Sequence, residues 1–279
     1  MELERARAIV PKLVWLDSVG STNDVVRDAI LHPDGSEWPH GSTVVTDDQT
    51  RGRGRLGRTW LAPTGKTLAI SVLLRPGATA GVALPADAYG WLPLIAGAAM
   101  TEAVREAVAA AEADRGGEDD GSGGVEVGLK WPNDVLVSGY KACGILSELL
   151  SDDAVVVGAG LNLTLDEHDL PTLTSTSLLL ATGVRPDADA VLAAYLGRLL
   201  GLVADLVAAG GDAEASGVQA RIVGLCGTIG QEVRVELPGG AELLGVAEGI
   251  DADGRLLVRD EETGRTQAVA AGDVTHLRY

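Results

Sequence analysis

Residues 125–163 read VEVGLKWPNDVLVSGYKACGILSELLSDDAVVVGAGLNL and contain three apolar, strand-like pieces. The pieces cover residues 125–131, 134–150 and 154–163, and only short polar or proline-containing breaks separate them. Short apolar runs between turn signals are typical of buried β-strands. The middle of the chain therefore predicts strands of a β-sheet.

The segments before and after this stretch predict the rest of the same domain. Ser21 stands at a helix N-cap position, with Asp24 three residues later in a capping-box pattern. We therefore expect an α/β (α+β) domain over residues 1–220, in which helices flank a mixed β-sheet. Further strands are predicted at 13–16, 41–49 and 66–75, and helices at 21–30, 91–113 and 187–210.

The sequence changes character after about residue 220. Short stretches of alternating apolar and polar residues follow, joined by the turn sequences DADG and EETG. This pattern predicts a small SH3-like β-barrel domain over residues 221–279. Within the first domain, DRGGEDDGSGG at 114–124 has nothing to bury, and it predicts a mobile surface loop.

Composition and charge narrow the classes of function. The 279 residues carry 22 Lys and Arg against 40 Asp and Glu, and the net charge of −18 argues against nucleic acid as a partner. Two cysteines without CxxC spacing and four scattered histidines indicate neither a disulfide framework nor a histidine metal site. The chain shows no signal-peptide pattern and no membrane-length apolar window, so we expect a cytoplasmic protein without a membrane partner.

The loop QTRGRGRLGRTW, residues 49–60, concentrates four arginines and three glycines in this acidic chain. Glycines let the backbone turn and expose its N–H groups to an anion, and arginines bind phosphate or carboxylate oxygens. Trp60 offers a flat apolar face that suits a purine ring. The loop therefore predicts a phosphate-binding site; the alternative is a solvated basic loop that pairs with acidic neighbours.

Three known phosphate-binding motifs are excluded. GRGRLG at 52–57 matches the dinucleotide-binding fingerprint, but Pro63 and Gly65 break the helix that must follow it. TGKT at 64–67 lacks the first glycine of a Walker A loop, whose position holds Trp60. The HRD and DFG signatures of protein kinases are absent from the sequence.

A GRGRxGRxW loop followed about 70 residues later by KWPND (130–134) and by KACGIL (141–146) resembles the biotin–protein ligases. GSTND (20–24) and GAGLNL (158–163) fall where that family has its matching segments. The resemblance covers nearly the whole chain, and four ordered segments, at 20–24, 49–60, 130–146 and 158–163, make it specific.

The resemblance implies a two-step reaction. Biotin's carboxylate attacks the α-phosphorus of ATP in the presence of Mg²⁺, which gives biotinyl-5′-AMP and pyrophosphate. The amine of one lysine on a biotin carboxyl carrier protein or domain of an acyl-CoA carboxylase then takes the biotin. Because carboxylate and polyphosphate repel each other, fixed positive groups are needed to stabilise the first transition state.

The resemblance also assigns roles to residues, and it assigns no protein ligand to the metal. Arg51 matches no arginine of the family, and we treat it as the solvated member of the loop. Biotin binding is assigned to Ser21, Thr22, Asn23, Gln49, Gly52, Arg53, Gly54, Arg55, Lys141 and Gly144. ATP or adenylate binding is assigned to Arg53, Arg55, Arg58, Trp60, Asn133, Lys141 and Asn162, and catalysis to Arg53, Asp134 and Lys141.

Several of these positions have simpler alternatives. Ser21 also fits a plain helix N-cap. Asp134, expected to position or deprotonate the acceptor lysine, also fits a cap of the WPND turn. Lys130 is the other choice by spacing for the role given to Lys141, and also fits a solvated strand end. Cys143 stands where the family more often has a small residue, so we expect it near the biotin pocket.

Two other functions remain as alternatives: a lipoate–protein ligase on the same core fold, and a non-catalytic biotin- or adenylate-binding protein. Lipoate ligases have different loop signatures. Because the ligase motifs begin within about 20 residues of Met1, we expect no N-terminal DNA-binding domain. The sequence leaves open whether the protein is a monomer or a homodimer.

Overall fold

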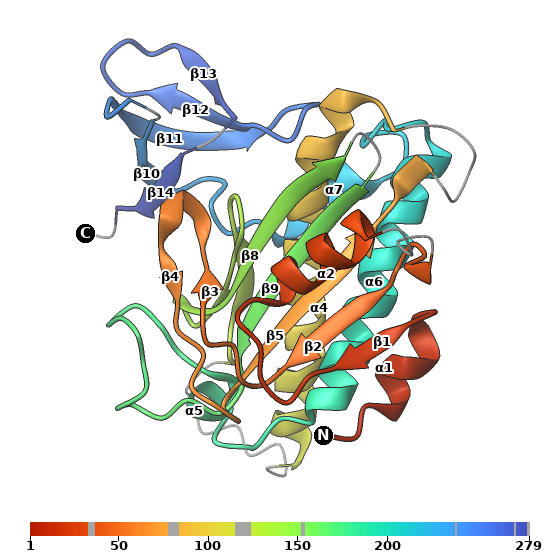
Figure 1. Ribbon diagram of the computed structural model, residues 1–279. Helices are drawn as coiled ribbons and strands as arrows, with labels where there is room; N and C mark the ends of the chain where they lie inside the picture. The colour runs from red at the N-terminus through yellow and green to blue at the C-terminus, as the bar shows by residue number, and fades with distance from the viewer. Residues whose placement is uncertain are drawn as a thin grey trace.

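The structure is a computed structural model of the chain, whose course is shown in Figure 1. It describes residues 1–32, 37–77, 84–114, 124–151, 154–237, 239–270 and 272–277. Of the predicted mobile surface loop, residues 115–123 lie outside the described residues.

A seven-stranded mixed sheet forms the centre of the larger part of the molecule. β1 and β2 run parallel, and every other neighbouring pair is antiparallel. With helices on both faces, this sheet confirms the predicted α/β fold class. Across the sheet the strands are β1 (Leu13–Trp15), β2 (Thr43–Thr46), β5 (Thr67–Leu74), β9 (Ala154–Asn162), β8 (Tyr140–Ser151), β7 (Asp134–Val137) and β6 (Val127–Lys130).

Residues 125–163 supply four neighbouring strands, where the sequence predicted three strand-like pieces. The piece predicted over 134–150 is a hairpin, because Ser138 and Gly139 both have positive φ, 49° and 80°. Positive φ at both central residues makes a two-residue turn whose twist matches that of the strands. The hairpin places KWPND and KACGIL, two motifs of this stretch, side by side.

Helices cover both faces of the main sheet. α4 (Trp91–Asp114) packs on β6 to β9, and α6 (Ala188–Ala208) packs on α4 behind the sheet in Figure 1. α1 (Glu4–Ile9) lies against α6, and α7 (Val218–Leu225) lies against α4. α2 (Thr22–Leu31) packs on β2, β5 and β9 from the opposite face, at the front in Figure 1.

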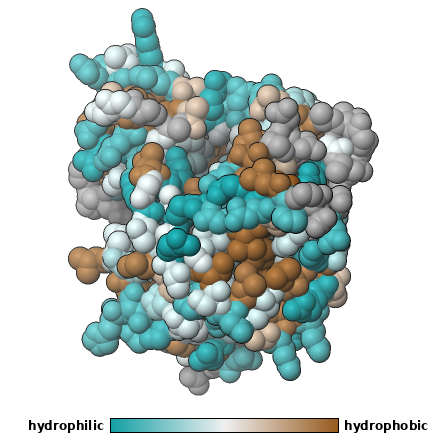
Figure 2. All heavy atoms as spheres, viewed as in Figure 1, coloured by the Kyte–Doolittle hydropathy of each residue, from teal (hydrophilic) through white to brown (hydrophobic). Residues whose placement is uncertain are grey.

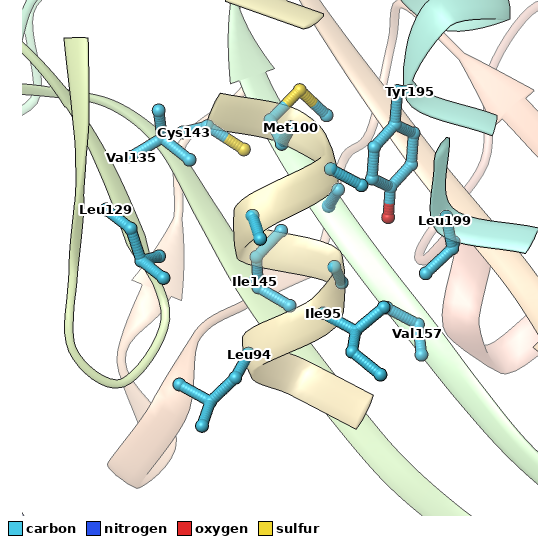
Figure 3. Packing of buried hydrophobic residues seen from close by; sticks show 14 of the residues in the cluster. Leu94, Ile95, Met100, Leu129, Val135, Cys143, Ile145, Val157, Tyr195 and Leu199 are labelled. Atoms are coloured by element: carbon cyan, nitrogen blue, oxygen red, sulfur yellow. The ribbon is translucent and has the colours of Figure 1, made fainter. Parts of the chain in front are cut away.

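The main core lies between the sheet and its two long helices. Each large apolar side chain that is buried here stabilises the fold by about 1.5–3 kcal/mol. On the opposite face, a smaller core forms around Val26, Val44 and Val156 under α2, and Figure 2 shows hydrophobic side chains between hydrophilic ones on that face. Figure 3 shows Leu94, Ile95 and Met100 of α4 with Leu129, Val135, Ile145 and Val157 of the sheet and Tyr195 and Leu199 of α6.

Cys143 belongs to the main core. Its side chain is 0% exposed and lies beside Val135 and Met100 in Figure 3. Burial raises the pKa of the Cys143 thiol, which keeps it in the unreactive protonated form. Expected near the biotin pocket, Cys143 instead points into the core, and it does not shape the ligand site.

α6 is long and apolar enough to cross a membrane, judged by length and composition alone. Its apolar side chains already have partners, since Val191, Tyr195 and Leu199 are among those buried in the main core. Burial in the core therefore accounts for the apolar composition of this helix.

The C-terminal residues form a second sheet of five antiparallel strands. This sheet confirms an all-β C-terminal unit, and the division between residues 220 and 221 stays a prediction. Its strands, in order across the sheet, are β13 (Thr266–Val269), β12 (Leu256–Asp260), β11 (Glu242–Ile250), β10 (Glu232–Glu236) and β14 (Asp273–His276).

Two tryptophans of the first part of the chain bind the turn before β12. Trp91 Nε1 donates a hydrogen bond to the carbonyl oxygen of Ala252 at 2.8 Å. Trp131 Nε1 donates to the carbonyl oxygen of Gly254 at 3.1 Å. Both indoles lie in the main core, so these bonds fix the second sheet against the first.

Candidate functional site

A cavity of about 320 Å³ lies where the main sheet, the Arg/Gly loop and the C-terminal sheet meet. Most of the residues assigned to binding or catalysis from the sequence line this cavity, although they are up to about 120 positions apart along the chain. They are Ser21, Thr22, Asn23, Gln49, Arg53, Gly54, Arg55, Arg58, Trp60, Asn133, Asp134, Lys141 and Gly144.

Two of the assigned residues lie behind the cavity wall. Gly52 allows the chain to pass close to itself, because a Cβ there would lie 2.5 Å from the carbonyl oxygen of Trp60. Asn162 is buried, and its Nδ2 donates to the carbonyl oxygen of Thr176 at 2.9 Å. Asn162 therefore fixes the segment after β9 rather than lining the cavity.

A second cavity of about 310 Å³ lies between α4, α6 and α5 (Leu178–Thr182). Alanines form much of its wall, and its Glu106 and Asp187 carboxylates are ion-paired with Arg198 and Arg5. None of the residues assigned from the sequence lines it. The cavity beside the Arg/Gly loop is therefore the candidate site.

The Arg/Gly loop is a small hairpin. β3 (Gly52–Arg53) and β4 (Thr59–Trp60) pair antiparallel, and the single 3₁₀ turn η2 (Arg55–Gly57) joins them. Leu56 and Gly57 reverse the chain with positive φ of 56° and 73°. The hairpin holds Arg53, Arg55 and Arg58 at the cavity wall. Arg53 and Arg58 also pair with acidic neighbours, as the alternative of a solvated basic loop predicts.

β7 and β8 place an aspartate and a lysine in contact at this wall. Lys141 Nζ lies 2.7 Å from Asp134 Oδ1, a contact between charges that lacks the alignment of a hydrogen bond. The same Nζ lies 5.7 Å from the centre of the Trp60 ring, within cation–π range. Lys141 therefore stands between a carboxylate and an aromatic face.

A β-bulge in β8 turns two residues of KACGIL toward the cavity. Neighbouring residues of β7 pair with Lys141 and Cys143, which leaves Ala142 as an extra residue in β8. Side chains alternate along a regular strand, so without the bulge residues 141 and 144 would lie on opposite faces. The bulge puts Lys141 and Gly144 at the cavity and buries Ala142 and Cys143 in the core.

The C-terminal sheet supplies partners for the arginines of the hairpin. Arg55 donates from Nη1 to Asn133 Oδ1 at 3.0 Å and from Nη2 to the carbonyl oxygen of Gly272 at 3.2 Å. Arg58 forms an ion pair with Asp273, which raises the pKa of Arg58, whereas burial lowers the pKa of Arg55. Within the described residues, Arg55 is therefore a partly buried cation bonded only to neutral groups, and it is available to an anionic ligand.

Trp60 packs on a glycine surface of the main sheet. A Cβ at Gly160 would lie 2.4 Å from the Trp60 ring, and one at Gly144 would lie 3.2 Å from it. Trp60 Nε1 is buried without a hydrogen-bond partner among the described residues. The ring is thus held as a flat wall of the cavity, with its nitrogen against Gly160.

Another part of the cavity wall is neutral and internally hydrogen-bonded. Gln49 Oε1 accepts from the backbone N of Thr22 at 2.9 Å and from its Oγ1 at 3.1 Å. Ser71 Oγ lies 2.7 Å from Thr22 Oγ1 and 2.6 Å from Asn23 Oδ1. Asn23 Nδ2 donates to Glu148 Oε2 at 2.7 Å. These bonds fix the hydroxyl and amide groups before any ligand binds.

Arg53 is held by two carboxylates beside this network. Its Nη1 and Nη2 each donate to Asp24 at 2.8 Å, and Nη2 also lies 3.4 Å from Glu148 Oε2. The hydrogen bonds from Arg53 are the main cause of the lowered pKa of Asp24, and Arg27 pairs with the same carboxylates. Ser21 is the N-cap of α2 but forms no capping bond through its side chain. The predicted capping box is therefore not formed, because Asp24 binds the arginines.

Sequence reasoning missed residues whose contacts are distant along the chain. Asp273 and Arg58 are 215 positions apart, and no local pattern marks such a pair. Ser71 has a weak signal, since it is the one central hydroxyl in the apolar run LAISVLL. The alternating glycines of GAGLNL are a clearer signal, because Gly158 and Gly160 leave room for Asn23 and the Trp60 ring.

Comparison with known proteins agrees with this geometry. Residues 15–162 match the Biotin/lipoate A/B protein ligase family, and residues 228–277 match the Biotin protein ligase C terminal domain. The biotin–[acetyl-CoA-carboxylase] ligase of Mycobacterium tuberculosis is 36% identical over 263 residues, which are 94% of this chain and 89% of that protein. The bifunctional ligase/repressor BirA of Escherichia coli is 30% identical, over 93% of this chain and 72% of that protein.

Solved structures have the same architecture. The Aquifex aeolicus biotin protein ligase in complex with biotin and ATP matches with a TM-score of 0.71 at 28% identity, covering 96% of this chain and 100% of that one. The Leishmania major biotin protein ligase in complex with biotinyl-5-AMP matches with a TM-score of 0.59 at 26% identity, covering 94% and 99%. This chain therefore belongs to the biotin/lipoate A/B protein ligase family and has the fold of its biotin protein ligases.

Proposed function

We propose that this chain is an ATP-dependent biotin–protein ligase. It forms biotinyl-5′-AMP from biotin and ATP, and then transfers biotin to a lysine of an acceptor protein. One observation carries the proposal: a neutral hydrogen-bonding wall, a cluster of cations and an aromatic face share one cavity. The names and ligands of the similar proteins support it, since they include biotin, ATP and biotinyl-5-AMP.

In the first step, the neutral wall binds the uncharged ureido ring of biotin through Thr22, Asn23 and Gln49. The carboxylate of biotin then lies against Lys141 and Arg55, together with the α-phosphate of ATP. A carboxylate oxygen bonds to the α-phosphorus, the bond to the bridging oxygen breaks, and pyrophosphate leaves with the electron pair. Arg53 contributes to this step once its guanidinium exchanges Asp24 for the ligand, because both oxygens of Asp24 now occupy it.

The adenine of ATP lies against Trp60, and Asn133 and Arg58 contact the rest of the nucleotide. The cavity lining includes all three residues. Trp60 is held in place by Gly160, which makes that glycine a test of nucleotide binding.

Gly160→Val is expected to raise the KM for ATP at least about 10-fold. The added side chain would overlap the Trp60 ring, and overpacking of this kind costs about 1–3 kcal/mol. Steady-state kinetics with varied ATP measure the effect, with a melting curve to check the fold. Gly249→Val is the matched control, because nothing lies within 4 Å of the position of its Cβ. An unchanged KM in the Gly160 variant would contradict the placement of adenine on Trp60.

In the second step, the acceptor lysine attacks the mixed anhydride of biotinyl-5′-AMP. An ordinary lysine amine is only about 0.04% neutral at pH 7, so a group that accepts its proton speeds the step. Asp134 is the carboxylate that faces the cavity next to Lys141. We propose that Asp134 positions and deprotonates the acceptor lysine.

Asp134→Asn is expected to slow biotin transfer about 10²-fold, which is the usual contribution of a general base. The rate of adenylate formation is expected to change less than about 3-fold. Single-turnover transfer from preformed biotinyl-5′-AMP, measured beside pyrophosphate exchange, separates the two steps. Equal losses in both steps would instead show that Asp134 only stabilises the WPND turn.

The site fits a magnesium ion that arrives on ATP. Mg²⁺ in proteins is commonly held by one or two carboxylates together with substrate phosphates. The cavity offers the carboxylates of Asp134 and Asp273, and no group of three or more possible metal ligands occurs among the described residues. Both carboxylates already face cations, Lys141 and Arg58, so Mg²⁺ would be held mainly by the phosphates of ATP and would neutralise their charge there.

The proposed acceptor is the biotin carboxyl carrier protein or domain of an acyl-CoA carboxylase. The name of the M. tuberculosis relative supports a carboxylase as partner. The net charge of −18 supports a protein acceptor over a nucleic acid, and the proposed location is the cytoplasm.

The proposal is tested by incubating the protein with biotin, ATP and Mg²⁺ and analysing the products by mass spectrometry. We expect biotinyl-5′-AMP and pyrophosphate, and a biotinylated lysine once a carrier domain is added. Biotin bound without any product would assign the chain to the non-catalytic alternative.

A further inference from the structure

Lys130, at the end of β6, is a cation of the cavity wall that the residue assignments left out. Two other cations there are paired with carboxylates, since Lys141 contacts Asp134 and Arg58 contacts Asp273. Within the described residues, the ammonium of Lys130 has neither a hydrogen bond nor an ion pair. The Lys130 side chain nevertheless lines the cavity, whereas the alternative of a solvated strand end would place it in solvent.

The surroundings of Lys130 are unusual for an unpaired charge. Burial lowers the pKa of Lys130, and the nearby Lys141 and Arg58 act in the same direction, while Asp134 and Asp273 oppose them. A partly buried charge without a partner costs free energy unless a ligand supplies the opposite charge. The side chain is therefore placed for an anion that enters the cavity.

The position of Lys130 differs from that of Lys141. Lys141 contacts the Trp60 ring, which places it near the proposed adenylate. Lys130 lies with Arg55 and Arg58 around Asp273, the carboxylate that the C-terminal sheet contributes. This second group of cations meets the cavity on the side of the C-terminal sheet, and it carries more positive charge than Asp273 neutralises.

We propose that Lys130 binds the pyrophosphate leaving group of ATP. The inference rests on the proposed ligase function and names a further catalytic residue for its first step. As the carboxylate oxygen bonds to the α-phosphorus, the bond from that phosphorus to the bridging oxygen breaks. The electron pair stays on the departing pyrophosphate, and Lys130 stabilises the added negative charge with N–H groups. Lys141 remains with the biotin carboxylate and the α-phosphate.

Lys130→Met is expected to slow adenylate formation about 10²-fold, which is the usual effect of losing one contact to a developing charge. It is also expected to raise the KM for pyrophosphate in the reverse reaction at least about 10-fold. Transfer of biotin from preformed biotinyl-5′-AMP to a carrier domain is expected to change less than about 2-fold, because pyrophosphate takes no part in it. Lys130→Arg keeps the charge and is expected to recover much of the lost rate. Lys12→Met is the matched control, since Lys12 lies over Trp38 and outside the cavity.

Direct binding gives a readout apart from turnover. Inorganic pyrophosphate is expected to raise the melting temperature of the unmodified protein and of Lys12→Met, but to raise that of Lys130→Met much less. Unchanged pyrophosphate binding and KM in Lys130→Met would overturn the inference, as would an equal loss in both half-reactions. If Lys130→Met does not fold, the same criteria apply to Lys130→Gln. Exchange by the unmodified protein tests the ligase function itself, so the two failures are distinguishable.

Discussion

Lys141→Ala lowers the rate of biotinyl-5′-AMP formation about 10³-fold, which corresponds to about 4 kcal/mol of the activation barrier. The physical reason is the position of its ammonium, 2.7 Å from Asp134 Oδ1 and 5.7 Å from the centre of the Trp60 ring. There it offsets the repulsion between the biotin carboxylate and the α-phosphate. The rate is measured by single-turnover formation of the adenylate with saturating biotin and ATP.

Two controls separate the charge from the fold. Lys12→Ala removes a lysine that lies over Trp38 and outside the cavity, and it is expected to leave the rate unchanged. Lys141→Arg keeps a cation and is expected to retain more activity than Lys141→Ala. An adenylation rate within about 3-fold of that of the unmodified protein in Lys141→Ala, with an unchanged melting curve, would contradict the assignment.

Arg55→Ala produces the second large effect, a loss of about 10² to 10³ in adenylate formation. Arg55 is partly buried and bonds only to Asn133 and the carbonyl oxygen of Gly272, so its charge is available to the ligand. Arg55 also joins the hairpin to the C-terminal sheet, so the melting curve of the Arg55→Ala variant is measured together with its rate. Arg51→Ala is the control from the same loop, since Arg51 is exposed and does not line the cavity. Equal small effects of both substitutions would show that the loop contributes only general positive charge.

The strands and long helices are predictable from the sequence because each depends on local pattern. The apolar runs that became β5 and β9 and the helical spacing of α4 and α6 carry their structure in neighbouring residues. The sequence predicts one strand-like piece over 134–150, because apolar residues on both sides hide the turn at Ser138 and Gly139, which both have positive φ. Within this segment the apolar pattern is a stronger signal than the turn residues.

The site is predictable only in part. The motifs locate Arg55, Asp134 and Lys141, whose positions follow from strand ends and turns. The side on which Cys143 lies depends on a bulge at Ala142, and simple alternation cannot predict it. The spacing marks Lys130 as an alternative to Lys141, but only the folded chain shows that its ammonium has no partner among the described residues. Contacts such as Arg58 with Asp273 join distant segments, and only the three-dimensional structure identifies them.

Exchange of labelled pyrophosphate into ATP tests the central claim most directly. The purified protein is assayed with Mg²⁺ and biotin, with Mg²⁺ and lipoate, and with no added acid. We expect exchange with biotin alone, because the cavity is proposed to form an adenylate with biotin, and pyrophosphate reverses that step. Exchange with lipoate alone, or with neither acid, would contradict the account of this chain as a biotin–protein ligase.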